Sequence, residues 1–218
     1  MTKIKICGLK RIEDVEMVNR YLPDFCGFII DFPKSHRNLT PDQVRELVKY
    51  LRKEKVMPIG VFVNEKPEVV AELLNDGTIV AAQLHGNEDN AYIAKLRTLT
   101  DKTIIKAFPI KNEEIFLEVK QTAADFILLD QGQGSGETFD WSLLSKEAAK
   151  DIIDCNNINK RKWFLAGGLN QNNIEKAIKL FHPYAVDLSS AVETDNFKDE
   201  EKVKNIIEIV RRCSNDKS

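Results

Sequence analysis

Short apolar segments rich in β-branched residues recur along this chain, and their number and spacing constrain its fold more than any other feature. Continuous apolar runs of this length are typical of strands that are buried on both faces of a parallel sheet. Eight segments are predicted as strands: 3–7, 25–30, 57–63, 79–84, 103–108, 126–130, 163–166 and 185–188.

Amphipathic stretches with helix-start signals separate these segments. Thr40 is a capping residue before Pro41, and apolar residues follow at helical spacing. Similar stretches begin at Asn64 and Asn170, and a last helix is predicted over residues 199–212. The apolar face of the stretch that begins at Asn170 is predicted from four residues, Ile174, Ala177, Ile178 and Leu180.

The alternation of strands and helices predicts an α/β protein built as a single (β/α)8 TIM barrel. Eight units of about 27 residues fill the 218-residue chain, which suits a compact barrel. The alternative is a doubly wound open sheet. The turn after the first predicted strand, Cys7-Gly8-Leu9-Lys10, is not the GxGxxG of a dinucleotide-binding sheet. We therefore prefer the barrel, with residues 1–218 as one catalytic domain.

Composition excludes several classes of partner. The chain is 43% hydrophobic and 30% charged, and its 32 basic and 34 acidic residues give a net charge of -2. Neither a nucleic-acid partner nor a membrane is expected, and no secretory signal is apparent, so we expect a cytoplasmic protein. The chain has four cysteines, Cys7, Cys26, Cys155 and Cys213. They show no CxxC spacing, so no metal is expected, and no cofactor is implied.

Polar and glycine residues gather where the predicted strands end, which is where barrel enzymes carry their active sites. Gly167-Gly168 and Ser189-Ser190 follow the last two strands. Barrels often bind phosphate there through backbone N–H groups, although a tight turn and a helix cap would also explain these residues. Lys34 and Arg37 after the second strand are candidates for binding an anion, and a solvated basic loop is the alternative.

Several of these segments together resemble the phosphoribosylanthranilate isomerases. The similarity begins at Lys5-Ile6-Cys7-Gly8-Leu9 and continues through Lys34-Ser35-His36-Arg37 and Gln83-Leu84-His85-Gly86. It extends over residues 134–141 and ends with Ala166-Gly167-Gly168-Leu169 and Asp187-Leu188-Ser189-Ser190. Motifs in the same order over about 200 residues are more specific than any single motif.

The resemblance implies an aldose–ketose isomerase of tryptophan biosynthesis that acts on a small phosphorylated substrate by acid–base catalysis. Cys7 matches the general base and Asp130 the general acid. Arg37 matches the residue that holds the anthranilate carboxylate, Asp187 contacts the sugar, and His85 lines the pocket. The phosphate-binding segments implied by the resemblance contain Gly134, Gly136, Gly167, Gly168, Ser189 and Ser190.

Two positions depart from the family's pattern. His36 stands where a proline is common, and Ala191 stands where a glycine is usual; if that position requires positive φ, alanine would be strained. A free cysteine has a pKa of about 8.5, so a cation that lowers it would favour a thiolate base. Lys3, Lys5 and Lys106 are candidates for that cation.

Other readings remain open at this point. The chain could be another phosphosugar barrel, such as an indole-glycerol-phosphate synthase or a metal-dependent pentose-phosphate epimerase, although its three histidines show no paired ligand spacing. An inactive phosphate-binding barrel is a different class, but it would be expected to have lost Cys7 or Asp130. Either a monomer or a homodimer is compatible with the sequence.

Overall fold

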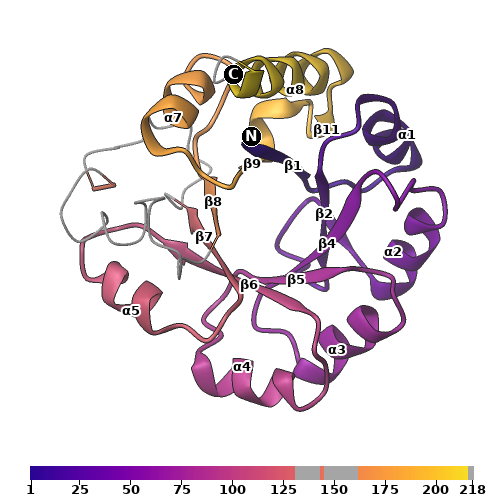
Figure 1. The fold of residues 1–218 in the computed structure, drawn as a ribbon. Coiled ribbons are helices and arrows are strands. Elements are labelled where there is room, and N and C mark those ends of the chain that lie inside the picture. The colour runs from indigo at the N-terminus through magenta and orange to yellow at the C-terminus, as the bar shows by residue number, and fades with distance from the viewer. Residues whose placement is uncertain (131–142, 145–161, 216–218) are drawn as a thin grey trace.

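Parallel strands follow one another around a closed ring in the computed structural model, which describes residues 1–130, 143–144 and 162–215. Each strand pairs with its neighbours in chain order, and the pairing of β1 with β2 closes the ring (Figure 1). The eight barrel strands are β1 (Lys3–Cys7), β2 (Phe25–Ile30), β4 (Met57–Phe62), β5 (Ala81–Leu84), β6 (Thr103–Pro109), β7 (Phe126–Asp130), β8 (Trp163–Ala166) and β9 (Ala185–Leu188). The predicted barrel is confirmed, and the open-sheet alternative is wrong.

Helices form an outer layer around the ring of strands (Figure 1). Those that the described residues contain are α1 (Ile12–Tyr21), α2 (Pro41–Val48), α3 (Pro67–Asn75), α4 (Asn90–Arg97), α5 (Ile115–Gln121), α7 (Ile174–Phe181) and α8 (Glu200–Asn215). A short strand β3 (Asn38–Leu39) pairs in parallel with the end of β2. A 3-10 turn η1 (Ser190–Val192) leads into a hairpin of β10 (Glu193–Thr194) and β11 (Phe197–Lys198). None of the described helices is long and apolar enough to cross a membrane.

The predicted element ends differ from the observed ones mainly at helices. The Thr40 cap is confirmed, since its hydroxyl accepts from the backbone N–H of Gln43. The stretch predicted to begin at Asn170 was wrong in two respects. The helix α7 begins at Ile174 rather than Asn170, and Leu180, predicted to face inward, is 53% exposed. Phe181 takes the buried position instead, because i, i+3, i+4 and i+7 from Ile174 share one helix face.

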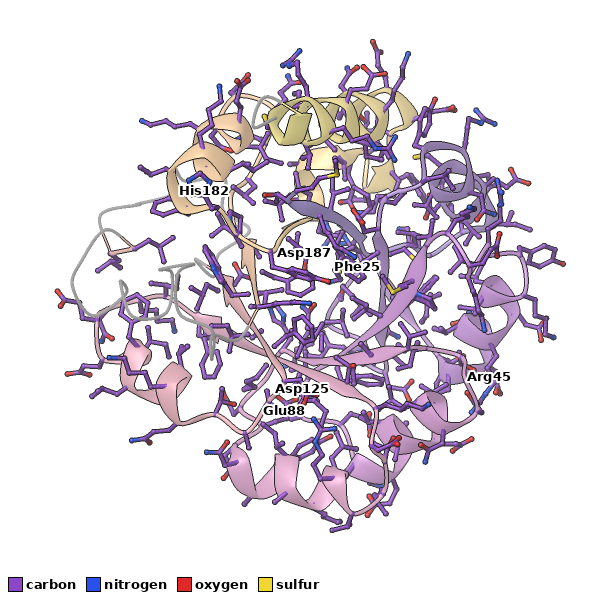
Figure 2. All side chains as sticks on the ribbon, viewed as in Figure 1. Phe25, Arg45, Glu88, Asp125, His182 and Asp187 are labelled. Carbon is purple, nitrogen blue, oxygen red and sulfur yellow. The ribbon has the colours of Figure 1, made fainter. Side chains whose placement is uncertain are left out.

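The apolar residues form two separate clusters, one on each side of the barrel wall. The larger cluster packs strands against helices, and the smaller one fills the barrel interior. At the N-terminal ends of the strands, the rings of Phe25, Phe126, Phe164 and Tyr184 lie 5.5–6.4 Å apart between centroids. Phe25 lies near the barrel axis in Figure 2. We call these four rings the aromatic floor; polar side chains occupy the interior above it.

Candidate active site

Three polar side chains from three strands meet inside the barrel, above the aromatic floor. The Lys5 ammonium of β1 donates to Asp187 Oδ2 of β9 and to Gln83 Oε1 of β5, both at 2.7 Å. The exposed fractions of Lys5, Gln83 and Asp187 are 0%, 1% and 8%, and Figure 2 shows Asp187 near the axis. Asp187 Oδ1 is buried without a hydrogen-bond partner among the described residues, so this oxygen can accept a hydrogen bond from a ligand.

Cys7 lies on the same side of β1 as Lys5, because residues two apart in a strand point the same way. The Lys5 ammonium lies 3.3 Å from the Cys7 sulfur. Gly27 is paired with Cys7 in the neighbouring strand β2. A Cβ at Gly27 would come within 2.6 Å of that sulfur, so the missing side chain at Gly27 makes room for the thiol.

Opposing effects act on the Cys7 thiol. Burial is the largest and raises the pKa of Cys7; the Lys5 ammonium opposes it, Asp187 adds to it, and Lys198 opposes it. The net direction is upward, so the Lys5 ammonium offsets only part of the effect of burial on the pKa of Cys7. Of the three cations considered from the sequence, Lys5 is the one beside Cys7. Lys3 lies over the Phe25 ring of the aromatic floor, and Lys106 points out of the barrel toward Glu88.

Asp130 and His85 lie at the ends of β7 and β5. His85 Nε2 is 3.3 Å from Asp130 Oδ2, and the other ring nitrogen, Nδ1, is 2.8 Å from Gln83 Nε2. Both residues line one edge of a cavity of about 730 Å³ that extends over α4 and α5, and neither Cys7 nor Asp187 is among its lining residues. Cys7 and Asp130 are therefore joined through three intervening side chains, Lys5, Gln83 and His85.

Arg37 is held by a carboxylate that sequence reasoning did not single out. Its Nε and one terminal nitrogen donate to the two oxygens of Glu193 at 2.7 and 2.5 Å, and Lys198 donates to Glu193 at 2.6 Å. Burial alone would raise the pKa of Glu193, but the bonds from Arg37 and the charge of Lys198 outweigh it and lower the pKa to about 2. Glu193 therefore fixes the guanidinium and leaves Nη1 without a partner among the described residues.

Gly8 explains how Arg37 reaches across the end of β1. Gly8 has a φ of +84°, and a Cβ there would lie 2.3 Å from the Arg37 Cδ and 3.2 Å from the Ser189 hydroxyl. A side chain at this position would be strained and would also displace Arg37. The Ser189 hydroxyl donates to the Cys7 carbonyl at 3.1 Å, so β9 and β1 are joined at the rim of the site.

The residues implied as phosphate-binding are partly described. Gly167 and Gly168 end β8 with φ of +85° and +63°, a conformation that favours glycine. Ser189 and Ser190 follow β9 at the same end of the barrel. Gly134 and Gly136 lie outside the described residues, as does Cys155. Ala191 does not have positive φ, so the expected strain at this departure from the family is absent.

Three contributors to the site were missed from the sequence: Gln83, Glu193 and Lys198. A buried glutamine in an otherwise apolar strand was a usable signal for Gln83. Glu193 and Lys198 face each other across the β10–β11 hairpin, and nothing in their spacing indicates the contact with Arg37. His36 also approaches Glu193, at 3.6 Å. No cluster of three or more potential metal-ligating side chains occurs in the described parts of the chain.

Comparison with known families and sequences gives a consistent match. Residues 4–209 match the model of the N-(5'-phosphoribosyl)anthranilate (PRA) isomerase family. The chain is 41% identical to the N-(5'-phosphoribosyl)anthranilate isomerase of Acetivibrio thermocellus, over 98% of this chain and 97% of that protein. It is 40% identical to the enzyme of the same name from Endomicrobium trichonymphae, over 97% of this chain and 99% of that protein.

Solved structures are also similar to this chain over nearly its whole length. Phosphoribosyl anthranilate isomerase from Thermotoga maritima superposes with a TM-score of 0.81 at 33% identity, covering 97% of this chain and 100% of that one. A phosphoribosyl anthranilate isomerase in complex with reduced 1-(o-carboxyphenylamino)-1-deoxyribulose 5-phosphate has a TM-score of 0.79 at 33% identity, with the same coverage.

Proposed function

The chain belongs to the N-(5'-phosphoribosyl)anthranilate isomerase family and catalyses that isomerisation in tryptophan biosynthesis, and we propose that Cys7 and Asp130 are its base and acid. The reaction converts N-(5-phosphoribosyl)anthranilate to 1-(2-carboxyphenylamino)-1-deoxyribulose 5-phosphate. The observation that carries the residue assignment is the connection of the two side chains, at the ends of β1 and β7, through Lys5, Gln83 and His85.

Two proton transfers account for the chemistry. Asp130 as a carboxylic acid protonates the furanose ring oxygen, the C1–O bond breaks, and the nitrogen lone pair forms an iminium with C1. The Cys7 thiolate then removes the proton from C2, which gives an enolamine. Protonation at C1 and loss of the C2 hydroxyl proton produce the ketone, so atoms balance and no external oxidant is required. Lys5, beside the sulfur, favours the thiolate when the base is needed.

The remaining residues bind the substrate. Arg37 holds the anthranilate carboxylate through the donors that Glu193 leaves available, and charge-assisted contacts of this kind are the stronger hydrogen bonds. Asp187 Oδ1 accepts from a sugar hydroxyl, which its lack of a partner among the described residues supports. His85 forms part of the pocket wall. The phosphate lies against Gly134, Gly136, Gly167, Gly168, Ser189 and Ser190.

The wider setting is also a proposal. Residues 1–218 form one catalytic domain in the cytoplasm, without a metal, cofactor or nucleic-acid partner. The protein is a monomer or a homodimer; the name of one similar Thermotoga maritima structure describes monomers generated from a dimeric phosphoribosylanthranilate isomerase. Sedimentation of the purified chain measures which of the two states it adopts.

Turnover of freshly made N-(5-phosphoribosyl)anthranilate, followed by its anthranilate fluorescence, tests the function directly. The purified protein is expected to cause an enzyme-dependent loss of fluorescence. The absence of any such loss would overturn the isomerase assignment.

Replacement of Arg37 by alanine is expected chiefly to raise KM. One hydrogen bond to a charged group is worth about 1.5–3 kcal/mol, so KM should rise by about 10- to 100-fold with a smaller change in kcat. Arg45→Ala is the matched control, because Arg45 is an arginine of α2 held by carboxylates outside the site, and KM of this variant should stay near the native value. An unchanged KM in Arg37→Ala would refute the carboxylate-binding role.

A further inference from the structure

The side chains between Cys7 and Asp130 carry hydrogen-bond directions that can be assigned one by one. The series begins at the Lys5 ammonium, which has three donors and no acceptor. Gln83 Oε1 lies 2.7 Å from it. The Gln83 amide is therefore fixed with its oxygen toward Lys5, because the reversed amide would set an NH2 group against an ammonium.

The orientation of the amide determines the protonation of His85. With its oxygen on Lys5, Gln83 presents the NH2 group to His85 Nδ1 at 2.8 Å. An amide nitrogen only donates, so Nδ1 must accept through its lone pair. The neutral ring then carries its proton on Nε2, the nitrogen that lies 3.3 Å from Asp130 Oδ2.

The same arrangement opposes a positive charge on His85. An imidazolium has a proton on both nitrogens, and its Nδ1–H would meet the Gln83 NH2 group, donor against donor. A cation at His85 would stabilise the Asp130 carboxylate and so disfavour the carboxylic acid that must protonate the sugar. Four other charged residues line the same cavity, Glu88, Asp89, Lys106 and Glu118. Lys106 and Glu88 are paired with each other at 3.2 Å.

We propose that Gln83 is a positioning residue, whose amide, oriented by Lys5, holds His85 as the neutral Nε2–H tautomer against Asp130. The proposal rests on the assignment of Asp130 as the acid. Its consequence is that one cation, Lys5, serves both ends of the site: directly it contacts the Cys7 sulfur, and through Gln83 it sets the polarity of the hydrogen bonds that end on Asp130.

The tautomer is measurable in the native protein without any activity assay. Two-bond 1H–15N correlation spectra distinguish Nε2–H, Nδ1–H and imidazolium rings, and single His36→Gln, His85→Gln and His182→Gln variants assign the three histidines. We expect His85 of the full-length wild-type protein to be the Nε2–H form at neutral pH. An Nδ1–H ring or an imidazolium there would overturn the proposal.

Gln83→Met tests whether the tautomer matters for turnover. Methionine has similar length but no amide, so His85 should become a mixture of forms, and kcat should fall by about tenfold, the effect of one typical hydrogen bond, with KM nearly unchanged. Gln83→Glu retains an acceptor for Lys5 but accepts from Nδ1–H, so its spectrum should show a proton on Nδ1, in the Nδ1–H ring or the imidazolium, and its kcat should also fall. Gln121→Met, an exposed position on the same cavity, is the control and should change neither readout.

The outcomes separate this proposal from the assignment of the acid and base. If Gln83→Met folds, by its circular dichroism, and keeps both the native tautomer and the native kcat, the positioning role is wrong. A changed tautomer with native kcat leaves Gln83 a structural residue and also refutes it. If the tautomer result holds while Asp130 variants remain active, the error lies in the acid assignment, and the proposed effect on turnover falls with it.

Discussion

Alanine in place of Cys7 is expected to lower kcat by about 100- to 10,000-fold, the usual contribution of one general acid or base. The thiolate would no longer be present to remove the C2 proton, whereas the residues proposed to bind carboxylate, sugar and phosphate would be unchanged. KM should therefore stay within a few-fold of the native value. Asp130→Asn should cause a loss of the same order, because the amide has nearly the same shape but no proton to give to the ring oxygen.

Steady-state kinetics with the fluorescent substrate measure both variants. Cys26→Ala is the matched control: Cys26 is the residue before Gly27 in β2 and is fully buried among apolar residues, so its loss should leave kcat near native. Near-native kcat in both Cys7→Ala and Asp130→Asn would show that the acid–base assignment is wrong.

Lys5→Met is expected to destabilise the folded protein by about 3–5 kcal/mol, the cost of leaving one member of a buried ion pair alone. Lys5 is fully buried, and Asp187 would lose the partner of its Oδ2 while Oδ1 already has none among the described residues. Urea unfolding at neutral pH measures the difference.

The pH dependence of that difference follows from the pKa of Lys5. Burial lowers the pKa, but Asp187 and Cys7 outweigh it, so the net direction is upward. The ammonium therefore contributes its full stabilisation below the unfolded-state value of about 10.4 and loses it as pH rises through the higher folded-state pKa. The gap between wild type and Lys5→Met should be constant across neutral pH and narrow in strongly alkaline solution.

Two further variants separate lost pairing from lost volume. In Lys5→Met with Asp187→Leu both charges are gone, and most of the stability should return, since apolar replacements of buried ion pairs are often neutral or stabilising. Lys49→Met removes a lysine from the exposed pair with Glu46, for which about 0–1 kcal/mol is expected. If Lys5→Met were as stable as wild type, the buried pair would not be holding β1 to β9.

Strand positions were readable from the sequence because each barrel strand is buried on both faces. Most of its residues are therefore apolar, and the predicted limits of β1, β2, β7, β8 and β9 agree with the observed ones. Helix limits were less readable. Three asparagines precede Ile174, and the side chains of Asn170 and Asn173 bond to the local backbone, which delays the start of α7 beyond the predicted residue. Leu180 was placed inward although Phe181 completes the same face.

The contacts in the site that join residues close together in the sequence could be predicted. Lys5 and Cys7 are two residues apart in one strand, so their shared direction follows from the strand itself. The contact of Gln83 with His85 is also local, but its contact with Lys5 depends on barrel closure, which brings residues 78 positions apart to 2.7 Å. The Arg37–Glu193 pair spans 156 positions and depends on a hairpin that no periodicity indicates. The periodicity of residues along one segment does not indicate which distant segment that segment contacts.

The aromatic floor has a consequence for how this enzyme tolerates mutation. Phe25 and Gly27 are neighbouring inward positions of β2, one a space-filling ring and the other the gap beside the thiol. Phe126 and Asp130 are likewise separated along β7 by a single inward residue, Leu128. In β2 and β7, the first inward residue therefore packs in the aromatic floor and a later inward position belongs to the site. In these two strands, substitutions that change thermal stability and substitutions that change substrate specificity would fall at different ends. Either property could therefore change without the other.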